Sequence, residues 1–154
     1  MVIGGVAVIA QGSERVTTDV DATVLLGRLR LEIAIEVFRK AGFTGREPRL
    51  AAFARESGVI LLRHNLSGTS VDVSLAGLPF EERALQRAEM MKLGGIALRV
   101  AHPADLIIYK MVAHRTRDLD DAEAMIRLHL PRINLAEVEA SIQEYLLTSH
   151  AETV

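Results

Sequence analysis

The chain of 154 residues contains no cysteine and no tryptophan, and it has only two tyrosines and four phenylalanines. The absence of cysteine excludes disulfides, thiolate metal sites and a cysteine nucleophile. So few aromatic residues argue against a stacking platform for single-stranded nucleic acid. No hydrophobic run approaches the roughly 20 residues that span a bilayer, so we expect no membrane partner. A chain without cysteine is compatible with the cytoplasm, which is the location that we expect.

An excess of charge of one sign is also lacking. Eighteen basic and 20 acidic residues give a formal net charge of −2, so bulk electrostatics require neither a nucleic acid nor an anionic membrane as partner. The contents of apolar residues (49%) and charged residues (25%) are those of an ordinary globular protein with one core. An apolar element that begins at residue 2 indicates that the chain starts inside a fold or that a preceding helix is missing.

Hydrophobic periodicity predicts a mixed fold of strands and helices. Strands are expected at 19–26, 59–63 and 69–75, with a further hairpin around Gly94-Gly95 over 89–100. Helices are expected at 28–41, 49–56, 80–87, 103–114, 118–130 and 134–147. Asn134 and Glu137 resemble a helix N-cap and its capping partner. The pattern therefore predicts an α+β protein, with a mixed α/β core over 1–100 and a C-terminal helical segment over 101–154 packed on it.

Three aspartates stand on the polar faces of two predicted strands. Asp19 and Asp21 are two residues apart, and because side chains alternate along a strand, both carboxylates lie on one face about 7 Å apart. Asp72 alternates with Val71 and Val73 in the same way. If the two strands are neighbours, the three carboxylates converge on one surface.

Such a cluster suggests a metal site, although a simpler interpretation exists. Neighbouring carboxylates repel one another and raise their pKa values, and a divalent cation reverses that balance. An open set of hard oxygen ligands suits Mg²⁺, and two such ions stabilise the attacking and leaving oxygens of a phosphoryl transfer. The alternative is an ordinary Asp-x-Asp pair at a solvated strand edge.

Gly4-Gly5 allows two interpretations as well. If Val2 and Ile3 end a strand and 6–11 form a short helix, Gly5 lies at the helix start, where its missing side chain lets a phosphate approach the backbone amides. The alternative is a two-residue hairpin turn, which Gly-Gly suits and which periodicity alone favours slightly.

The segment 4–21 resembles the signature of the DNA polymerase β-like nucleotidyltransferase superfamily. That signature is a glycine followed by glycine or serine, a spacer, and Asp-hydrophobic-Asp, as in Gly4-Gly5 and Asp19-Val20-Asp21. The finer pattern, Gly-Gly-x-Ala and then Arg15-x-Thr, is similar to the AbiEii/AbiGii toxin branch and its minimal relatives. Asp72, the lysine-bearing segment 103–110 and the Arg-Asp-x-x-Asp segment 117–121 resemble later motifs of that group, so the resemblance covers roughly residues 2–128.

The resemblance implies a nucleotidyltransferase-type mixed β-sheet with flanking helices. It also implies site residues: Gly4 and Gly5 would hold a nucleoside triphosphate, Asp19 and Asp21 would bind two Mg²⁺ ions, and Asp72 would bind the catalytic ion. Asp72 would also help to activate the acceptor hydroxyl as a general base.

Four further residues carry weaker expectations. The resemblance implies that Lys110 neutralises a phosphate charge, that Arg15 braces the site, and that Asp118 and Asp121 line the nucleotide pocket. From the residues alone, Lys110 can equally be a solvated lysine on a helix face. A salt bridge from Arg15 to Asp19 or Glu14, and helix capping by Asp118, are the interpretations that we favour.

The implied activity is Mg²⁺-dependent transfer of a nucleoside monophosphate from an NTP to an acceptor hydroxyl, with release of pyrophosphate. A toxin-like member would act on RNA, such as a tRNA end, and be controlled by a cognate antitoxin. Contact with RNA requires a local basic patch. The candidates for it are Arg28, Arg30, Arg39, Arg46 and Arg49, although these arginines can equally be ordinary solvent-exposed residues on helix surfaces. Because full toxins are longer, we expect a minimal member whose acceptor-binding parts are reduced or supplied by a partner.

Two other functions stay open. One is nucleotidylation of an aminoglycoside or lincosamide antibiotic, and the other is a nucleotidyltransferase-fold module that binds or regulates without turnover. Zinc and hydrolase chemistry have no support, because no serine stands in a nucleophile elbow and no ligand spacing links the histidines His64, His102, His114, His129 and His150.

Overall fold

The computed structural model describes residues 1–151, with side chains described through residue 148. In this part of the chain, one mixed sheet has the strand order β3-β4-β5-β2-β1-β7-β6. Its strands are β1 (Val2–Ile3), β2 (Asp19–Val24), β3 (Phe43–Gly45), β4 (Val59–His64), β5 (Ser70–Leu75), β6 (Glu89–Leu93) and β7 (Ile96–Val100). Its helices are α1 (Gly4–Ala10), α2 (Leu31–Lys40), α3 (Leu50–Ser57), α4 (Pro79–Arg87), α5 (Pro103–Ala113), α6 (Thr116–His129) and α7 (Leu135–Ala151), with a 3₁₀ turn η1 (Leu130–Arg132).

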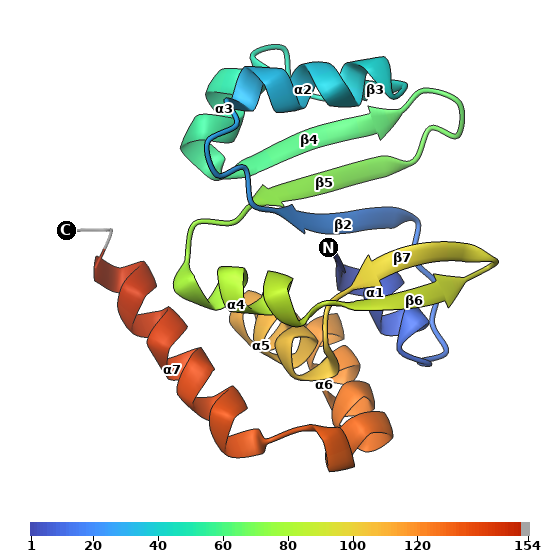
Figure 1. The fold of residues 1–154 in the computed structure, drawn as a ribbon. Coiled ribbons are helices and arrows are strands. Elements are labelled where there is room, and N and C mark those ends of the chain that lie inside the picture. The colour runs from blue at the N-terminus through green and yellow to red at the C-terminus, as the bar shows by residue number, and fades with distance from the viewer. Residues whose placement is uncertain (152–154) are drawn as a thin grey trace.

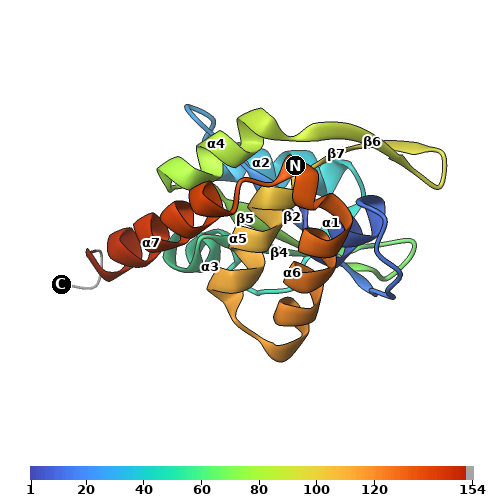
Figure 2. The same ribbon diagram turned by 90° about the horizontal axis from the view of Figure 1, so that it is seen from below.

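Helices cover both faces of the sheet (Figure 1). On one face, α2 and α3 pack against the buried Ile60, Leu62 and Val73 of β4 and β5. On the other face, α1, α4 and α5 share a second core with α6 and α7, which includes the buried Val8 and Ile108 (Figure 2). Full burial of one such side chain contributes about 1.5–3 kcal/mol, so these two cores hold the sheet between two helical layers.

Most of the elements predicted from periodicity are confirmed. β4 and β5 pair antiparallel, as do β6 and β7, whose turn residues Gly94 and Gly95 both have positive φ. α2 begins at Leu31 rather than at residue 28. Asn134 caps α7, because its Oδ1 accepts hydrogen bonds from the backbone N–H groups of Ala136 (3.2 Å) and Glu137 (3.4 Å). The mixed α/β fold class is therefore confirmed.

The hairpin interpretation of Gly4-Gly5 is wrong. β1 pairs antiparallel with β2 and parallel with β7, and the chain then leaves the sheet as α1. Gly4 begins that helix with a φ of +64°, a conformation that L-residues with a side chain rarely adopt. Pairing with strands far along the chain, rather than the local turn preference, decides the conformation here. Within residues 1–151, no helix combines the length and the apolarity that crossing a membrane requires.

Candidate active site

The sheet brings the three predicted carboxylates together. β2 and β5 are parallel neighbours, and their register places Asp21 directly opposite Asp72. Paired residues of adjacent strands present their side chains on the same face, and Asp19 shares that face because it precedes Asp21 by two residues. All three line one cavity of about 360 Å³, together with residues of α5 and α6. The convergence expected from strand alternation is thus present in the fold.

The negative charges of the three carboxylates repel one another. Burial raises the pKa of Asp21, the neighbouring charges of Asp19 and Asp72 raise it further, and Lys110 and Arg115 oppose the shift. Thr17 donates a hydrogen bond from its hydroxyl to Oδ1 of Asp19 (3.0 Å). The ionised form of Asp21 is therefore less favourable in the protein than in water, and a cation placed among the three carboxylates would relieve this cost.

Arg46 supplies part of the missing positive charge. Its backbone N–H donates to the carbonyl of Leu61 on β4 (2.9 Å), and its guanidinium donates to Oδ1 of Asp72 on the next strand. The Arg46 side chain is 26% exposed, and its Nε is buried without a hydrogen-bond partner. The sequence analysis named Arg46 only as a basic-patch candidate. The contact with Asp72 depends on the order β3-β4-β5, which no local pattern reveals.

The opposite wall of the cavity is cationic. Lys110 of α5 donates to Oδ1 of Asp118 (3.0 Å) and pairs with Oδ2 of Asp121 (2.7 Å) on α6. Its side chain is only 9% exposed, so the interpretation as a solvated lysine is wrong. α5 packs in the core with mostly apolar residues, and a buried ammonium there requires carboxylate partners.

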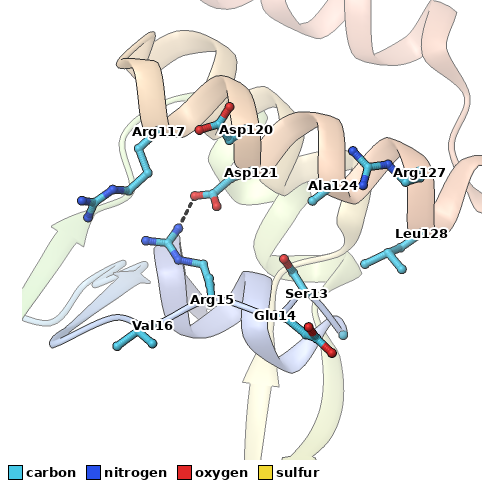
Figure 3. Close-up of a pocket in the computed structure, with 11 residues that line it drawn as sticks. Ser13, Glu14, Arg15, Val16, Arg117, Asp120, Asp121, Ala124, Arg127 and Leu128 are labelled. Atoms are coloured by element: carbon cyan, nitrogen blue, oxygen red, sulfur yellow. Dashed lines mark hydrogen bonds and ion pairs between the residues drawn. The ribbon is translucent and has the colours of Figure 1, made fainter.

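Arg15 also joins this network, through a partner that the sequence analysis did not choose. The expected salt bridge to Asp19 or Glu14 is wrong: the Arg15 guanidinium pairs with Oδ2 of Asp121, 106 residues away in the chain. α6 lies against the loop between α1 and β2 and thereby brings Asp121 to Arg15 (Figure 3). Asp121 consequently holds both Arg15 and Lys110 in place.

Asp118 caps α6, as favoured from the sequence. Its Oδ2 accepts hydrogen bonds from the backbone N–H (3.2 Å) and from Nε (2.7 Å) of Arg115. Burial alone would raise the pKa of Asp118, but the hydrogen bonds from Arg115 and Lys110 outweigh it and lower the pKa. Arg115 and Arg117 line the cavity as well. The signal that could have identified them is their Arg-x-Arg-Asp sequence at the start of α6.

Neither Gly4 nor Gly5 has room for a side chain, because side chains of the site lie directly against both positions. A Cβ on Gly4 would overlap Oδ2 of Asp21 and lie 2.8 Å from the Asp21 Cβ. A Cβ on Gly5 would lie 2.8 Å from the Thr17 Oγ1 and 3.3 Å from the Arg15 Cζ. Gly5 lines the cavity, between the acidic and the cationic wall.

Of the remaining sequence candidates whose side chains are described, Arg46 contacts a residue of the cavity, and the others do not line it. Arg39 pairs with Glu36 of its own helix, and Arg46 pairs with Asp72, so two of the five basic-patch arginines have carboxylate partners. His102 accepts the backbone N–H of Ala104 at the start of α5. His150 lies outside the residues whose side chains are described.

Comparison with known proteins identifies the class of fold. No family model matches the sequence, and neither does any curated protein. Among solved structures, the chain is similar to an antigenic nucleotidyltransferase-like protein from Paracoccidioides brasiliensis, with a TM-score of 0.50 and 17% sequence identity. The match covers 82% of this chain and 66% of the other. The chain therefore has a nucleotidyltransferase-like fold, while the AbiEii/AbiGii branch remains a prediction.

Proposed function

We propose that the protein is a Mg²⁺-dependent nucleotidyltransferase that moves a nucleoside monophosphate from an NTP to an acceptor hydroxyl. One observation carries the proposal: Asp21 lies opposite Asp72 and beside Asp19, in a cavity whose other wall consists of Arg15, Lys110 and Arg115. The nucleotidyltransferase-like fold supports the same class of reaction.

The donor set fits divalent cations. Three carboxylates face one cavity, and burial, together with the neighbouring charges of Asp19 and Asp72, raises the pKa of Asp21. In the described part of the chain, no three His, Asp or Glu side chains lie so that they could hold one metal ion together, but Mg²⁺ commonly uses only one or two carboxylates with water and substrate phosphates. We assign Asp19 and Asp21 to both ions and Asp72 to one. Mg²⁺ at these carboxylates would neutralise the phosphates and stabilise the charge that develops during transfer.

The cationic wall provides the site for the triphosphate. Lys110 and Arg15 are held by buried carboxylates, so their positive charges are oriented before a nucleotide binds, and such preorganisation avoids the cost of reorganisation. Gly5 lets the phosphate chain approach the backbone between the two walls, where any side chain would meet Thr17. Lys110, Arg15 and Gly5 therefore bind the β- and γ-phosphates in this proposal, and Gly4 and Asp121 keep the surrounding groups in position.

Asp72 prepares the acceptor. Its carboxylate accepts the proton of the acceptor hydroxyl, the oxygen forms a bond to the α-phosphorus, and the bond from that phosphorus to the bridging oxygen breaks. Pyrophosphate leaves with the electron pair of the broken bond. Arg46 orients the Asp72 carboxylate through the hydrogen bond from its guanidinium.

The position of Arg46 indicates which kind of acceptor the site prefers. A guanidinium beside the proposed base attracts an acceptor that carries phosphate near its hydroxyl, and it repels a polycationic aminoglycoside. We therefore favour RNA, as for a toxin that a cognate antitoxin protein controls, over an antibiotic.

The test is transfer of radiolabel from each of the four α-³²P-labelled NTPs, with Mg²⁺, to total RNA and to aminoglycosides. Labelled RNA supports the preferred acceptor, and labelled drug would move the proposal to antibiotic modification. Asp21→Asn should lower transfer by about 100-fold or more. Because burial and the charges of Asp19 and Asp72 oppose the ionisation of Asp21, removing its charge should leave the protein folded.

Glu139→Gln provides the matched control, since it removes one negative charge from an exposed position on α7 and should leave transfer unchanged. No transfer to either acceptor, together with retained NTP binding, would refute catalysis and leave a nucleotide-binding module.

A further inference from the structure

The strands β4 and β5 have one face against which α2 and α3 do not pack. Because paired residues of adjacent strands share a face, the register places three pairs on the face of Asp72: Leu61 with Asp72, Val59 with Ser74, and Arg63 with Ser70. α2 and α3 pack against the opposite face of these strands. β4 lies on the side of β5 away from β2, so this surface, which we call the β4–β5 face, extends from Asp72 away from the cavity between β2 and the cationic wall (Figure 1).

Two apolar side chains on the β4–β5 face take no part in the cores of the protein. Val59 and Leu61 are partly exposed, and neither hydrophobic core includes them. Leu61 is the direct neighbour of Asp72, and residues paired in this way have Cβ atoms about 4.5–5.5 Å apart. A ligand whose reacting group lies at Asp72 can therefore bury apolar area against Leu61.

The same face carries two positive charges. Arg63 is exposed, and in the described part of the chain its guanidinium pairs with no carboxylate and donates to the carbonyl of Gly68 (3.1 Å). The backbone of Arg46 is hydrogen-bonded to that of Leu61, and its guanidinium donates to Asp72. A guanidinium without a carboxylate partner is available to a phosphate, which it can bind through two parallel hydrogen bonds.

Apolar area between a carboxylate and a free guanidinium fits an unpaired strand of RNA. Unpaired nucleotides expose the faces of their bases to protein side chains, whereas bases inside a duplex stack on one another. None of the residues named on the β4–β5 face is aromatic, so this face cannot hold a long strand by stacking. It is therefore suited to the last few nucleotides of a strand and to a phosphate that precedes them.

We propose that the β4–β5 face binds the unpaired 3′ end of an RNA acceptor, with the terminal bases on Leu61 and Val59 and a preceding phosphate at Arg63. The inference rests on the proposed function, because that function places the acceptor hydroxyl at Asp72. It adds that the acceptor has to end in a single strand. It also adds that the acceptor and the NTP reach the carboxylates from opposite sides, the acceptor over β4 and the NTP along the cationic wall.

The first experiment compares two RNA hairpins that end in the same 3′ nucleotide, one with a short unpaired 3′ end and one blunt. Each hairpin carries a fluorophore at its 5′ end, and fluorescence anisotropy measures its affinity for the full-length protein with Mg²⁺ and without NTP. The hairpin with the unpaired end should bind about tenfold or more tightly than the blunt hairpin. Equal affinities would overturn the proposal.

The second experiment uses variants of the face. Arg63→Gln should weaken binding of the unpaired end about fivefold or more and reduce the slope of log Kd against log salt by about 0.7, the value for one phosphate contact to a single strand. Leu61→Ser should weaken the same RNA without changing that slope. Arg28→Gln, which also removes an exposed arginine but outside this face, should change neither quantity. All three variants should bind NTP as the wild type does, which shows that they are folded.

The outcomes separate this proposal from the proposed function. Binding of the unpaired end through Arg63 and Leu61, in a protein that transfers no label, refutes catalysis and leaves the RNA surface standing. Transfer that is equally fast to blunt and unpaired ends and unaffected by Arg63→Gln refutes this surface alone. Label on an aminoglycoside, in a protein that binds neither hairpin, also refutes the surface but leaves nucleotidyl transfer itself standing.

Discussion

Gly4→Ala tests whether the glycine at the start of α1 sets the position of Asp21. A residue with a side chain at a φ of +64° costs roughly 1–2 kcal/mol. The added Cβ would overlap the Asp21 carboxylate and lie 2.8 Å from the Asp21 Cβ, so Asp21 or its strand has to move. Forced repacking of this kind costs about 1–3 kcal/mol more. We expect a total loss of about 2–5 kcal/mol in the free energy of unfolding.

Gly58→Ala separates the two contributions. Gly58 has a φ of +71°, and nothing lies within 4 Å of an added Cβ. This variant is therefore destabilised only by the unfavourable backbone conformation. Gly4→Ala should therefore be less stable than Gly58→Ala by about 1–3 kcal/mol. It should also bind Mn²⁺ more weakly than Gly58→Ala does, because the Asp21 carboxylate is displaced.

Urea unfolding followed by far-ultraviolet circular dichroism measures the stabilities, since the chain has no tryptophan to report by fluorescence. Electron paramagnetic resonance of Mn²⁺ measures metal binding without any nucleotide. Equal stability of the two variants within about 0.5 kcal/mol, together with equal Mn²⁺ affinity, would refute the close approach of Gly4 to Asp21 as the reason for this glycine.

Three further predictions concern charged groups around the cavity. Arg46→Met should tighten Mn²⁺ binding to the free protein, because the cation no longer competes with a guanidinium for Asp72; weaker binding in the same titration would contradict this competition. Lys110→Met should cost about 3 kcal/mol or more in urea unfolding, because it leaves Asp118 and Asp121 buried with less positive charge; a loss below about 1 kcal/mol would contradict the buried network. Asp118→Asn should destabilise the protein at pH 7. Since the folded pKa of Asp118 lies below its ordinary value of 3.8, the difference from the wild type should shrink as the pH falls below that value, and a difference independent of pH would be inconsistent with this assignment.

The sequence predicted those helices and turns whose geometry depends on residues close to one another in the chain. Gly94 and Gly95 supply the two positive φ angles that a tight turn needs, so the β6–β7 hairpin follows from the sequence. Asn134 satisfies the free backbone N–H groups at the start of α7 with its own side chain. The convergence of Asp21 and Asp72 was predictable in part: alternation fixes which face each carboxylate takes, whereas a shift of one residue between the strands would have separated them.

Contacts that depend on the order of strands and the packing of helices could not be predicted. Gly4-Gly5 suits a hairpin locally, and only the pairing of β1 with β2 and β7 selects a helix. Arg15 has the nearby carboxylates Asp19 and Glu14, but α6 delivers Asp121 from 106 residues away. Arg46 reaches Asp72 across an intervening strand.

The two walls of the cavity come from distant parts of the chain, and this limits how the protein can be divided. The acidic wall belongs to β2 and β5, whereas Lys110 and Arg115 come from α5 and the residue before α6. A fragment that ends at residue 100 would keep the three carboxylates and Arg46, lose the positive charges of Lys110 and Arg115, and expose the apolar surface that α5 covers. Two separately expressed halves could regain a functional cavity only by reassociating, so fragment complementation would require the core and the charge balance to be restored in one step.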